Sequence, residues 1–466
     1  MEKFDVCVIG AGPGGYVAAI RAGQSGLNVA LVEKNHFGGT CLNIGCIPTK
    51  TLIASVEVLH KTQHAAEFGI EITGEIKADW TKMLARKDDV IGKLRGGIES
   101  LLKSAGVKVF SGTASFLNRK NIIVNGGVDS GAKIEANNFI IATGSESLVP
   151  KFIPESPRVL TSTELLSVPK IPKSLLVLGG GVIGCEFACL FAGLGTEVTV
   201  VEMLPSILPN IDRETVRVLS TKMKQAGIKI LTGAPLEDIK ASSKGVSGKV
   251  AGETLTADYL LVSIGRKAVT AGLNAAGAGV AVDERGWIPV DAKCRTNVPG
   301  IYAIGDIGGK IWLAHLASAM AVCAVDNIAG KRSEFNYNLI PGCIFTNPEI
   351  GTVGLTEEQC KERGINYNVG KFPFAALGKA MAINETDGFC KIIADAETDQ
   401  VLGVHIIGPH ATDLIAEAVP AMNLEITARE LGKAIHPHPT LGEVMMEAAH
   451  ALHGESAHIP VRRKRK

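Results

Sequence analysis

The sequence predicts an α/β protein built from two similar halves, followed by a separate C-terminal α+β domain. An apolar run at residues 4–9 leads into a glycine-rich loop at residues 10–15, then a helical stretch and a second apolar run that ends at Glu33. The same order returns from residue 174 to Glu202, and in both copies the acid follows the first glycine by 23 residues. Continuous apolar runs of this kind are typical of buried parallel strands. We therefore expect two Rossmann-like dinucleotide-binding domains, because an internal repeat indicates repeated architecture.

The other elements follow from the same patterns, and prolines between residues 150 and 172 mark a linker. Helices are expected at residues 40–63, 80–104, 413–423, 428–433 and 444–452. Strands are expected at 108–116 and 121–124, as an antiparallel pair, and at 139–141, 258–266, 301–306, 342–346, 366–372 and 388–395. The expected segments are 1–148 and 149–268 for the two dinucleotide-binding domains, 269–336 for a central segment, and 337–466 for the C-terminal domain.

Composition excludes several classes of function. At 466 residues the chain has room for about three domains. Its net charge of +1 argues against a broad surface for nucleic acid or anionic membrane. No apolar run is expected to span a membrane, and the first strand starts too early for a signal or transit peptide, although a processed organellar protein would look similar. The ten cysteines lack zinc-like CxxC spacing, so we expect no metal site and mostly reduced thiols, as in a cytoplasmic protein.

The glycines of the first loop have separate tasks. Gly10 makes the turn, Gly12 lets the backbone approach a pyrophosphate, and Gly15 packs the helix on the strand. Glu33 is positioned to accept hydrogen bonds from the adenosine ribose hydroxyls. In the second copy the same tasks fall to Gly179, Gly181, Gly184 and Glu202.

Glu202 also predicts which nicotinamide nucleotide is used. A carboxylate binds the ribose diol of NAD and repels the 2′-phosphate of NADP. Residues 203–205 offer no arginine to bind that phosphate. The sequence therefore favours NAD.

Cys41 and Cys46 stand behind a glycine pair and ahead of Pro48. On a regular helix their Cα atoms would lie about 8–9 Å apart, whereas a disulfide needs less than about 7 Å. Gly45 and Pro48 permit a distorted first turn in which a bridge could form. Thiolates near a helix start are also stabilised. We expect a redox-active disulfide, with two buried helix thiols as the alternative; Cys185 and Cys189, four apart, are interpreted as a packed core face.

Motifs in several separate places resemble the class I flavin-dependent pyridine nucleotide-disulfide oxidoreductases, and the likeness covers nearly the whole chain. They are GGTCLNIGCIPTK at 38–50, ATG at 142–144, IYAIGD at 301–306 and HPHPTLGE at 436–443, besides the two glycine loops. The resemblance implies FAD and NAD as cofactors and a relay from thiols through the flavin to the nicotinamide. Cys41 would be the thiol that reacts with substrate, and Cys46 the one against the flavin. Lys50 would approach flavin N5 and pair with Glu186.

The same resemblance assigns an acid–base pair. His438 would move the proton of the reacting thiol, and Glu443 would hold its imidazole in place. In the family this pair comes from the partner subunit of a homodimer, so residues 337–466 are expected to form a dimerisation domain. A histidine between prolines could also be purely structural.

The resemblance completes the expected flavin site. Asp306 would hold the ribityl chain, and Ala314 would lie near the flavin ring. The chain departs from the usual family pattern after this point, with Leu316 and Met320-Ala321 where a lysine and a Glu-Gly are common. The remaining expected cofactor contacts are Gly112, Thr143, Gly144 and Gly265.

Within the family, the sequence of the cysteine motif is most similar to that of members that oxidise protein-bound dihydrolipoamide. This likeness implies lipoyl domains of 2-oxoacid dehydrogenase complexes, or the glycine cleavage carrier protein, as partners. Two alternatives stay open. One is another disulfide reductase with an unusual thiol substrate, and the other is a flavoprotein kept as a scaffold or binding module. The basic run 462–466 is interpreted as a solvated tail.

Overall fold

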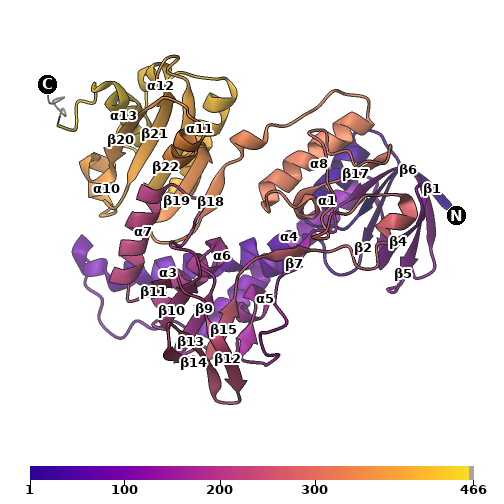
Figure 1. Ribbon diagram of the computed structural model, residues 1–466, viewed down its shortest axis with the longest axis horizontal. Helices are drawn as coiled ribbons and strands as arrows, with labels where there is room; N and C mark the ends of the chain where they lie inside the picture. The colour runs from indigo at the N-terminus through magenta and orange to yellow at the C-terminus, as the bar shows by residue number, and fades with distance from the viewer. Residues whose placement is uncertain (461–466) are drawn as a thin grey trace. The chain divides into compact units, whose positions relative to one another are not determined.

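The computed structural model describes residues 1–460, so the basic run 462–466 lies outside the described residues. The chain forms two compact units, each assembled from separate segments. The first combines residues 1–153, 160–170 and 264–335; the second combines 154–159, 171–263 and 336–466. The first and third expected segments thus fall mainly in one unit, and the second and fourth mainly in the other (Figure 1).

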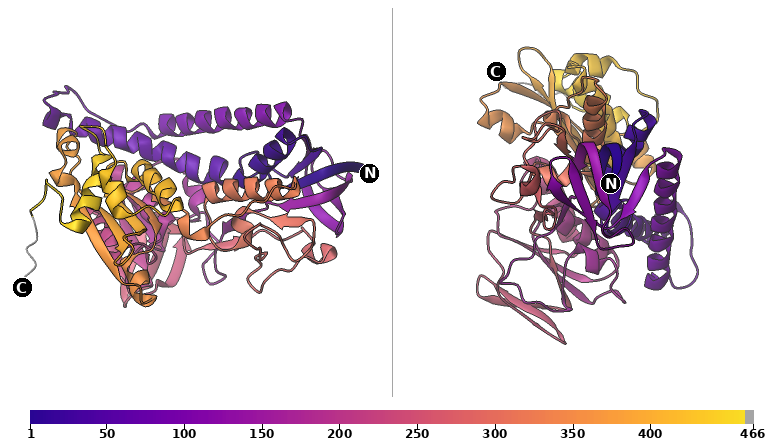
Figure 2. Two further views of the ribbon diagram at one scale, coloured as in Figure 1. Left: turned by 90° about the horizontal axis from the view of Figure 1, so that it is seen from above. Right: turned by 90° about the vertical axis from the view of Figure 1, so that its right-hand side faces the viewer.

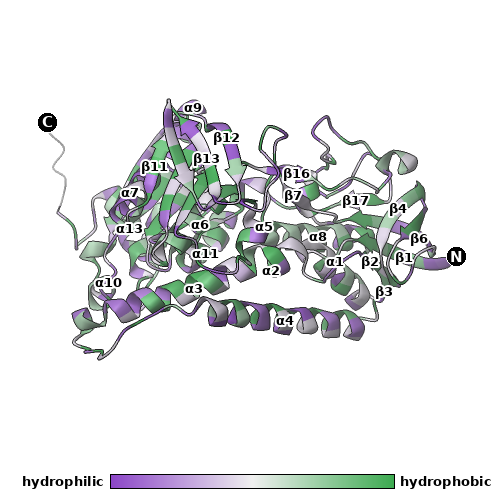
Figure 3. Cartoon of the chain, turned by 90° about the horizontal axis from the view of Figure 1, so that it is seen from below, coloured by the Kyte–Doolittle hydropathy of each residue, from purple (hydrophilic) through white to green (hydrophobic). Residues whose placement is uncertain are grey.

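The first unit is organised around a sheet in the order β3-β2-β1-β6-β5-β4, with β17 paired to β6. The pairs β1–β2, β1–β6, β2–β3 and β6–β17 are parallel, whereas β4–β5 and β5–β6 are antiparallel. The run 29–32 of β2 and the ends of β1 (6–9) and β6 (139–141) are apolar and buried, and they contribute to the core. Figure 3 colours the ribbon by hydropathy, with apolar residues in green. The strands are β1 (Glu2–Ile9), β2 (Val29–Glu33), β3 (Lys108–Ser111), β4 (Thr113–Asn118), β5 (Asn121–Asn125), β6 (Lys133–Ile141) and β17 (Ile301–Ala303).

Helices cover this sheet and carry the thiol segment. α1 packs against α8, and α3 runs beside the long helix α4 (Figure 2). The expected helix at 40–63 is broken at Gly45, whose backbone leaves the helical region (φ −141°, ψ −112°). The helices are α1 (Pro13–Gln24), α2 (Gly39–Ile44), α3 (Cys46–Gln63), α4 (Trp80–Ser104), α5 (Ser162–Leu165) and α8 (Ala314–Ile328), with the short strand pair β7 (Ser145–Ser147) and β16 (Arg266–Ala268).

Two expectations for this unit were wrong. Residues 108–116 are two strands, because Gly112 turns the chain with φ 149°; the first of them pairs parallel to β2. The stretch 39–63 is, by length and composition alone, apolar enough to cross a membrane, although no such run was expected. A single helix of this kind is weak evidence for a membrane span, since core helices of soluble proteins pass the same test.

The second unit contains the repeated nucleotide fold, a small antiparallel sheet and the C-terminal domain. The parallel strands run in the order β11-β10-β9-β15, and the small sheet in the order β12-β13-β14. The strands are β9 (Ser174–Leu178), β10 (Glu197–Glu202), β11 (Lys229–Thr232), β12 (Glu237–Ser242), β13 (Gly245–Val250), β14 (Glu253–Ala257) and β15 (Tyr259–Val262). The helices are α6 (Val182–Gly193) and α7 (Arg213–Gln225).

The C-terminal domain is a five-stranded antiparallel sheet in the order β18-β19-β22-β21-β20. Its middle strand β22 is buried and was not expected from the sequence, nor was β19. Helices α11 and α13 pack on the sheet. The elements are β18 (Gly342–Ile344), β19 (Glu349–Gly354), α9 (Glu357–Glu362), β20 (Tyr367–Pro373), α10 (Gly378–Ala382), β21 (Phe389–Asp395), β22 (Val401–Gly408), α11 (Ala411–Asn423), α12 (Ala428–Lys433) and α13 (Glu443–His453).

A buried ion cluster joins this domain to the start of α7. Lys391 on β21 is fully buried, and its Nζ lies 3.0 Å from both carboxylate oxygens of Asp212. The same Nζ lies 2.7 Å from Glu214 and 2.8 Å from Glu357. Burial alone would raise the pKa of Asp212, but neighbouring cations and hydrogen bonds lower it overall. The cluster satisfies a charge that would otherwise be very costly to bury.

Candidate active site

Of the three motif glycines in the first loop, only one leaves room for a ligand. A side chain at Gly10 would come within 2.5 Å of Ala142 O, and one at Gly15 within 1.8 Å of Gly10 O. A side chain at Gly12 would meet nothing closer than Gly39 Cα at 4.0 Å. Packing inside the protein therefore explains Gly10 and Gly15, whereas Gly12 borders open space at the start of α1, where a pyrophosphate would bind.

The second copy repeats this arrangement. A side chain at Gly184 would lie 2.0 Å from Gly179 O, whereas one at Gly181 would meet no heavy atom of the described residues within 4 Å. Gly179 has φ 106°, close to the 98° of Gly10. Both loops thus fit a dinucleotide pyrophosphate at the same place relative to their helix.

The two acids also occupy matching positions. Glu33 accepts hydrogen bonds from Ala11 N at 2.6 Å and Asn35 N at 2.8 Å. Glu202 accepts them from Gly180 N at 2.7 Å and Leu204 N at 2.8 Å. Each carboxylate therefore ties the glycine loop to the turn after the strand. Its oxygens keep further lone pairs that a ribose hydroxyl could use.

Thr143 offers a separate sign of a missing ligand. Its Oγ1 is buried and has no hydrogen-bond partner among the described residues, and such groups are rare in folded proteins. Gly144, beside it, has φ 71° and borders open space. Gly112 instead packs against the strand β5, and the Gly265 carbonyl accepts Leu148 N at 3.0 Å. Thr143, Gly144 and Gly265 thus fit cofactor contacts, since both glycines border open space, while packing against β5 accounts for the conformation of Gly112.

Asp306 is held by residues that the sequence did not single out. Its Oδ2 accepts Ser145 Oγ at 2.5 Å and lies 3.8 Å from Arg266 Nε. Arg266 also donates to Ser145 Oγ at 2.6 Å and Ser145 O at 2.7 Å. The arginine and serine fix the carboxylate, and Ala314 begins α8 shortly after it. The short pair β7–β16, which brings Ser145 and Arg266 together, had no clear sequence pattern.

Cys41 lies on α2 and Cys46 begins α3, on either side of the break at Gly45. The structure records both as thiols, and the redox-active disulfide between them stays a prediction. A hydrogen bond to Cys46, together with burial, raises the pKa of Cys41, contrary to the expected helix-start effect; Lys50 partly opposes the shift. Burial, together with the charge of the Cys41 thiolate, raises the pKa of Tyr16.

The thiol segment is packed directly on the first glycine loop. A side chain at Gly39 would come within 2.6 Å of Gly12 Cα, and Gly38 N donates to Ala11 O at 2.8 Å. On the other side, Arg95 of α4 donates twice to Asn43 Oδ1, at 3.1 and 2.6 Å. Backbone contact and this clamp fix the thiols relative to the pyrophosphate loop. The roles of Asn43 and Arg95 were not visible in the sequence, because they depend on helix packing.

His438 and Glu443 are paired in the second unit. His438 Nδ1 lies 2.8 Å from Glu443 Oε1, and Thr440 N donates to Glu443 Oε2 at 2.9 Å. The His438 side chain is 75% exposed, so Nε2 is available to a reactant. Burial opposes the shift, but the hydrogen bonds from Thr440 and His438 lower the pKa of Glu443 overall. The carboxylate therefore stays ionised at neutral pH and favours the imidazole tautomer with hydrogen on Nδ1.

His436, the other histidine of the HPHP motif, and the predicted Glu186 also have defined contacts. His436 is only 8% exposed, and its ring nitrogens contact Glu417 Oε1 at 2.8 Å and Ala434 O at 2.9 Å. It is a structural histidine, in agreement with the choice of His438. Glu186 on α6 is buried and accepts Phe345 N at 3.0 Å.

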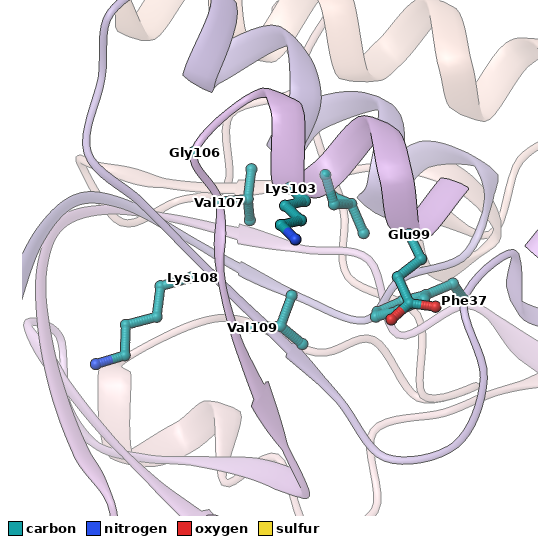
Figure 4. A pocket seen from close by; sticks show the side chains of 8 residues that line it. Phe37, Glu99, Lys103, Gly106, Val107, Lys108 and Val109 are labelled. Atoms are coloured by element: carbon teal, nitrogen blue, oxygen red, sulfur yellow. The ribbon is translucent and has the colours of Figure 1, made fainter. Parts of the chain in front are cut away.

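A surface pocket of about 570 Å³ lies apart from these groups in the first unit (Figure 4). The end of α4 and the edge strand β3 form it. Its lining combines apolar side chains with Glu99, Lys103 and Lys108. It contains none of the residues predicted for the site.

Comparisons with known proteins agree with this geometry. Residues 4–321 match the pyridine nucleotide-disulphide oxidoreductase family, and residues 340–449 match its dimerisation domain. The chain is 44% identical to dihydrolipoyl dehydrogenase of Chlamydia muridarum, over 99% of this chain and 100% of that protein. It is 41% identical to dihydrolipoyl dehydrogenase of Bacillus subtilis, over 98% of this chain and 99% of that one.

Solved structures agree as well. LpdA from Mycobacterium tuberculosis superposes with a TM-score of 0.90 at 27% identity, covering 97% of this chain and all of that one. The flavoprotein disulfide reductase RclA from Escherichia coli, as its Cu(II) complex, gives 0.87 at 31% identity, covering 96% and 99%. The full-length matches, the two glycine loops and the dithiol packed on the first of them lead to one conclusion: the chain is an oxidoreductase and belongs to the pyridine nucleotide-disulphide oxidoreductase family.

Proposed function

We propose that the chain is an NAD-linked, FAD-dependent dihydrolipoamide dehydrogenase. It oxidises the dithiol of protein-bound dihydrolipoamide to the disulfide and reduces NAD⁺ to NADH, with release of one proton. The observation that carries this proposal is the contact of the Cys41–Cys46 segment with the first glycine loop, through Gly39 and Gly12. A dithiol beside a dinucleotide site is what electron transfer between thiols and a cofactor requires.

The thiol chemistry follows from the residues of this chain. In the oxidised enzyme, a substrate thiolate attacks the Cys41 sulfur, the Cys41–Cys46 bond breaks, and the Cys46 thiolate leaves. The second substrate thiolate then attacks its own mixed-disulfide sulfur, and Cys41 leaves as a thiolate. Lipoamide is released, and the Cys41–Cys46 pair is left reduced.

His438 serves as the base for the substrate thiols and returns a proton to Cys41. Glu443 orients its imidazole and stabilises the charged form. Bound FAD would supply the two-electron relay between the reduced pair and NAD⁺. Asp306, held by Ser145 and Arg266, and Thr143 would bind FAD, with Lys50 near the flavin and paired to Glu186.

The family also suggests an assembly and partners for this chain. The chain carries the family's dimerisation domain, and we propose a homodimer in which His438 faces the partner subunit's dithiol. The substrate would arrive on lipoyl domains of 2-oxoacid dehydrogenase complexes or on the glycine cleavage carrier protein. The expected location is the cytoplasm.

The deciding experiment assays purified, FAD-loaded protein with dihydrolipoamide and either NAD⁺ or NADP⁺. We expect NADH formation with NAD⁺ that is abolished by Cys46→Ser. A panel of other disulfides with NADH tests for a different thiol substrate, and failure with dihydrolipoamide alone would favour that enzyme. A flavin spectrum that NADH and every dithiol leave unchanged would instead indicate a scaffold protein.

A further inference from the structure

A second pair of cysteines meets in the first unit, away from Cys41 and Cys46. Cys294 lies in the loop before β17, and Cys323 lies in the middle of α8. Both are buried, with 0% and 3% of their surface exposed. Cys294 Sγ lies 3.5 Å from Met320 O on α8, and Cys323 Sγ lies 3.8 Å from Ala292 O in the loop. Each sulfur thus reaches the backbone beside the other.

The two thiols lie close enough for each to shift the pKa of the other. The nearby Cys323 thiol, together with burial, raises the pKa of Cys294. The nearby Cys294 thiol lowers the pKa of Cys323. Asn327 Nδ2 adds a contact to Cys323 Sγ at 3.5 Å. These directions favour Cys323 as the group that ionises, with Cys294 as the thiol beside it.

The backbone at Cys294 supports a role beyond packing. This residue has φ 64°, a left-handed conformation that is uncommon for residues with a side chain. Residues held in such conformations concentrate at functional positions. Here the turn Asp291–Cys294, closed by Cys294 N to Asp291 O at 3.0 Å, presents the thiol to α8.

We propose that Cys294 and Cys323 are a second redox pair, which a peroxide converts to a disulfide. The Cys323 thiolate attacks one peroxide oxygen, the O–O bond breaks, and hydroxide leaves to take up a proton as water. The sulfenic acid on Cys323 is then attacked by the Cys294 sulfur. The S–S bond forms, the S–O bond breaks, and a second water leaves with the Cys294 proton. Overall, two thiols and one hydrogen peroxide give one disulfide and two waters.

The burial of both sulfurs selects the oxidant. Hydrogen peroxide is little larger than water and can reach a buried sulfur during small fluctuations, whereas a tripeptide disulfide cannot. The bond would close a ring of 30 residues, from 294 to 323, that contains Asp306 and Ala314. Oxidation would therefore fasten α8 to the loop that leads into the expected flavin-binding segment. The proposal does not depend on which thiol substrate the enzyme uses.

Peptide mapping of the FAD-loaded protein tests the pair directly. The protein is reduced, desalted and treated with excess hydrogen peroxide. It is then denatured in the presence of iodoacetamide, which alkylates the remaining thiols, and digested with trypsin. Cleavage after Lys293, Arg295, Lys310 and Lys331 separates the cysteines into the dipeptide 294–295 and the peptide 311–331. We expect the cysteines of these two peptides to escape alkylation. The peptides should appear as one disulfide-linked species that a reductant separates.

The same digest contains its own controls. Peptide 35–50 holds both Cys41 and Cys46. Oxidation of that pair therefore forms a disulfide inside one peptide, which is two hydrogen atoms lighter than the reduced, unalkylated peptide and is not linked to another peptide. Cys390 is fully buried and has its pKa raised by burial, and it should be alkylated and unlinked. If peptide 35–50 is oxidised while Cys294 and Cys323 stay alkylated after prolonged treatment, the proposal is wrong.

Two variants test the assigned order of attack. In Cys294→Ser, Cys323 has no resolving thiol, so its sulfenic acid should be trapped by dimedone after peroxide treatment. In Cys323→Ser, Cys294 should resist dimedone, because its thiol stays protonated. Dimedone on Cys294 and none on Cys323 would reverse the order, and a link from Cys323 to any other cysteine would refute the pair. The wild-type map decides the main point even if a variant fails to fold.

Discussion

Replacing Glu202 with alanine is the sharpest test of nucleotide choice. Glu202 uses one oxygen for Gly180 N and the other for Leu204 N. Glutamine would not be a neutral replacement, because its amide nitrogen would face one of these N–H groups. Alanine removes the charge, the proposed ribose acceptor and both backbone contacts at once. A control variant must therefore lose equivalent backbone hydrogen bonds at a site that does not bind the nicotinamide nucleotide.

Glu33→Ala is that control. Glu33 makes the matching contacts to Ala11 N and Asn35 N in the other copy of the fold. Its loss should weaken retention of FAD and leave the preference between NAD and NADP unchanged. A preference that changed equally in both variants would show that the effect comes from general loosening of the fold.

The magnitude follows from the interactions removed. A hydrogen bond to a charged group contributes about 1.5–3 kcal/mol, so NAD affinity should fall about 10- to 150-fold. For NADP, Glu202→Ala also removes a repulsion, which for two unit charges 4 Å apart is at most about 4 kcal/mol at an effective dielectric constant of 20. Glu202 is only partly buried, so we use the lower end of the hydrogen-bond range and leave the repulsion out of the estimate. The ratio of kcat/KM for NAD to that for NADP should fall at least about tenfold.

The assay measures kcat/KM for both nucleotides with dihydrolipoamide in saturating amounts. Wild-type protein should favour NAD strongly, and Glu202→Ala should narrow the gap mainly through KM. Equal use of the two nucleotides by the wild type would refute the argument from the carboxylate. So would a variant whose ratio matches that of the wild type.

Three further predictions concern the dimer, the thiols and the ion cluster. Subunits carrying Cys46→Ser and His438→Ala should each be inactive, and activity should return in demonstrated mixed dimers; no recovery would place the whole site within one chain. Cys41→Ser should show a thiolate-to-flavin charge-transfer band without turnover, and Cys46→Ser should lose both; the opposite pattern would exchange the two roles. Lys391→Met should destabilise the fold by about 3–5 kcal/mol, measured by urea unfolding, because Asp212 is left buried without its partner. The lowered pKa of Asp212 means that its stabilising contribution is full above the unfolded pKa of about 4 and is lost as pH falls through the folded value; a wild-type stability that stays constant across this range would contradict the assignment.

The parts of the fold that the sequence predicted well are those with strong local signals. Both glycine loops and their acids were found, because turns with positive φ need glycine and the repeat fixes the spacing. A distortion near Gly45 was anticipated, although the helix 40–63 was expected to be continuous; a side chain at Gly45 would come within 2.9 Å of Thr40 O. The helix Trp80–Ser104 was predicted with its observed ends, since Asp79 caps its start and its apolar face is regular.

The parts that were missed depend on contacts distant in sequence. Ser145 and Arg266 meet only because two three-residue strands pair, and such short strands have no periodicity to detect. Strand β22 is buried along its length, so it shows an apolar run instead of the alternation expected of an antiparallel sheet. Lys391 lies in a strand that reads as apolar, and its burial depends on carboxylates more than thirty residues away.

The contact between Gly39 and Gly12 connects the two chemical motifs of the first unit physically. A side chain at Gly39 would clash with Gly12 Cα, so backbone atoms meet where the thiol segment packs on the pyrophosphate loop. The glycine loop is itself fixed by Gly15 against Gly10 O, and the thiol segment is held from the other side by Arg95. Rotation of a side chain cannot change this spacing, which a proposed transfer between thiol and cofactor must keep constant through each turnover. Gly39 therefore has a positioning role in the proposed reaction, because it lets the thiol segment pack directly on the glycine loop.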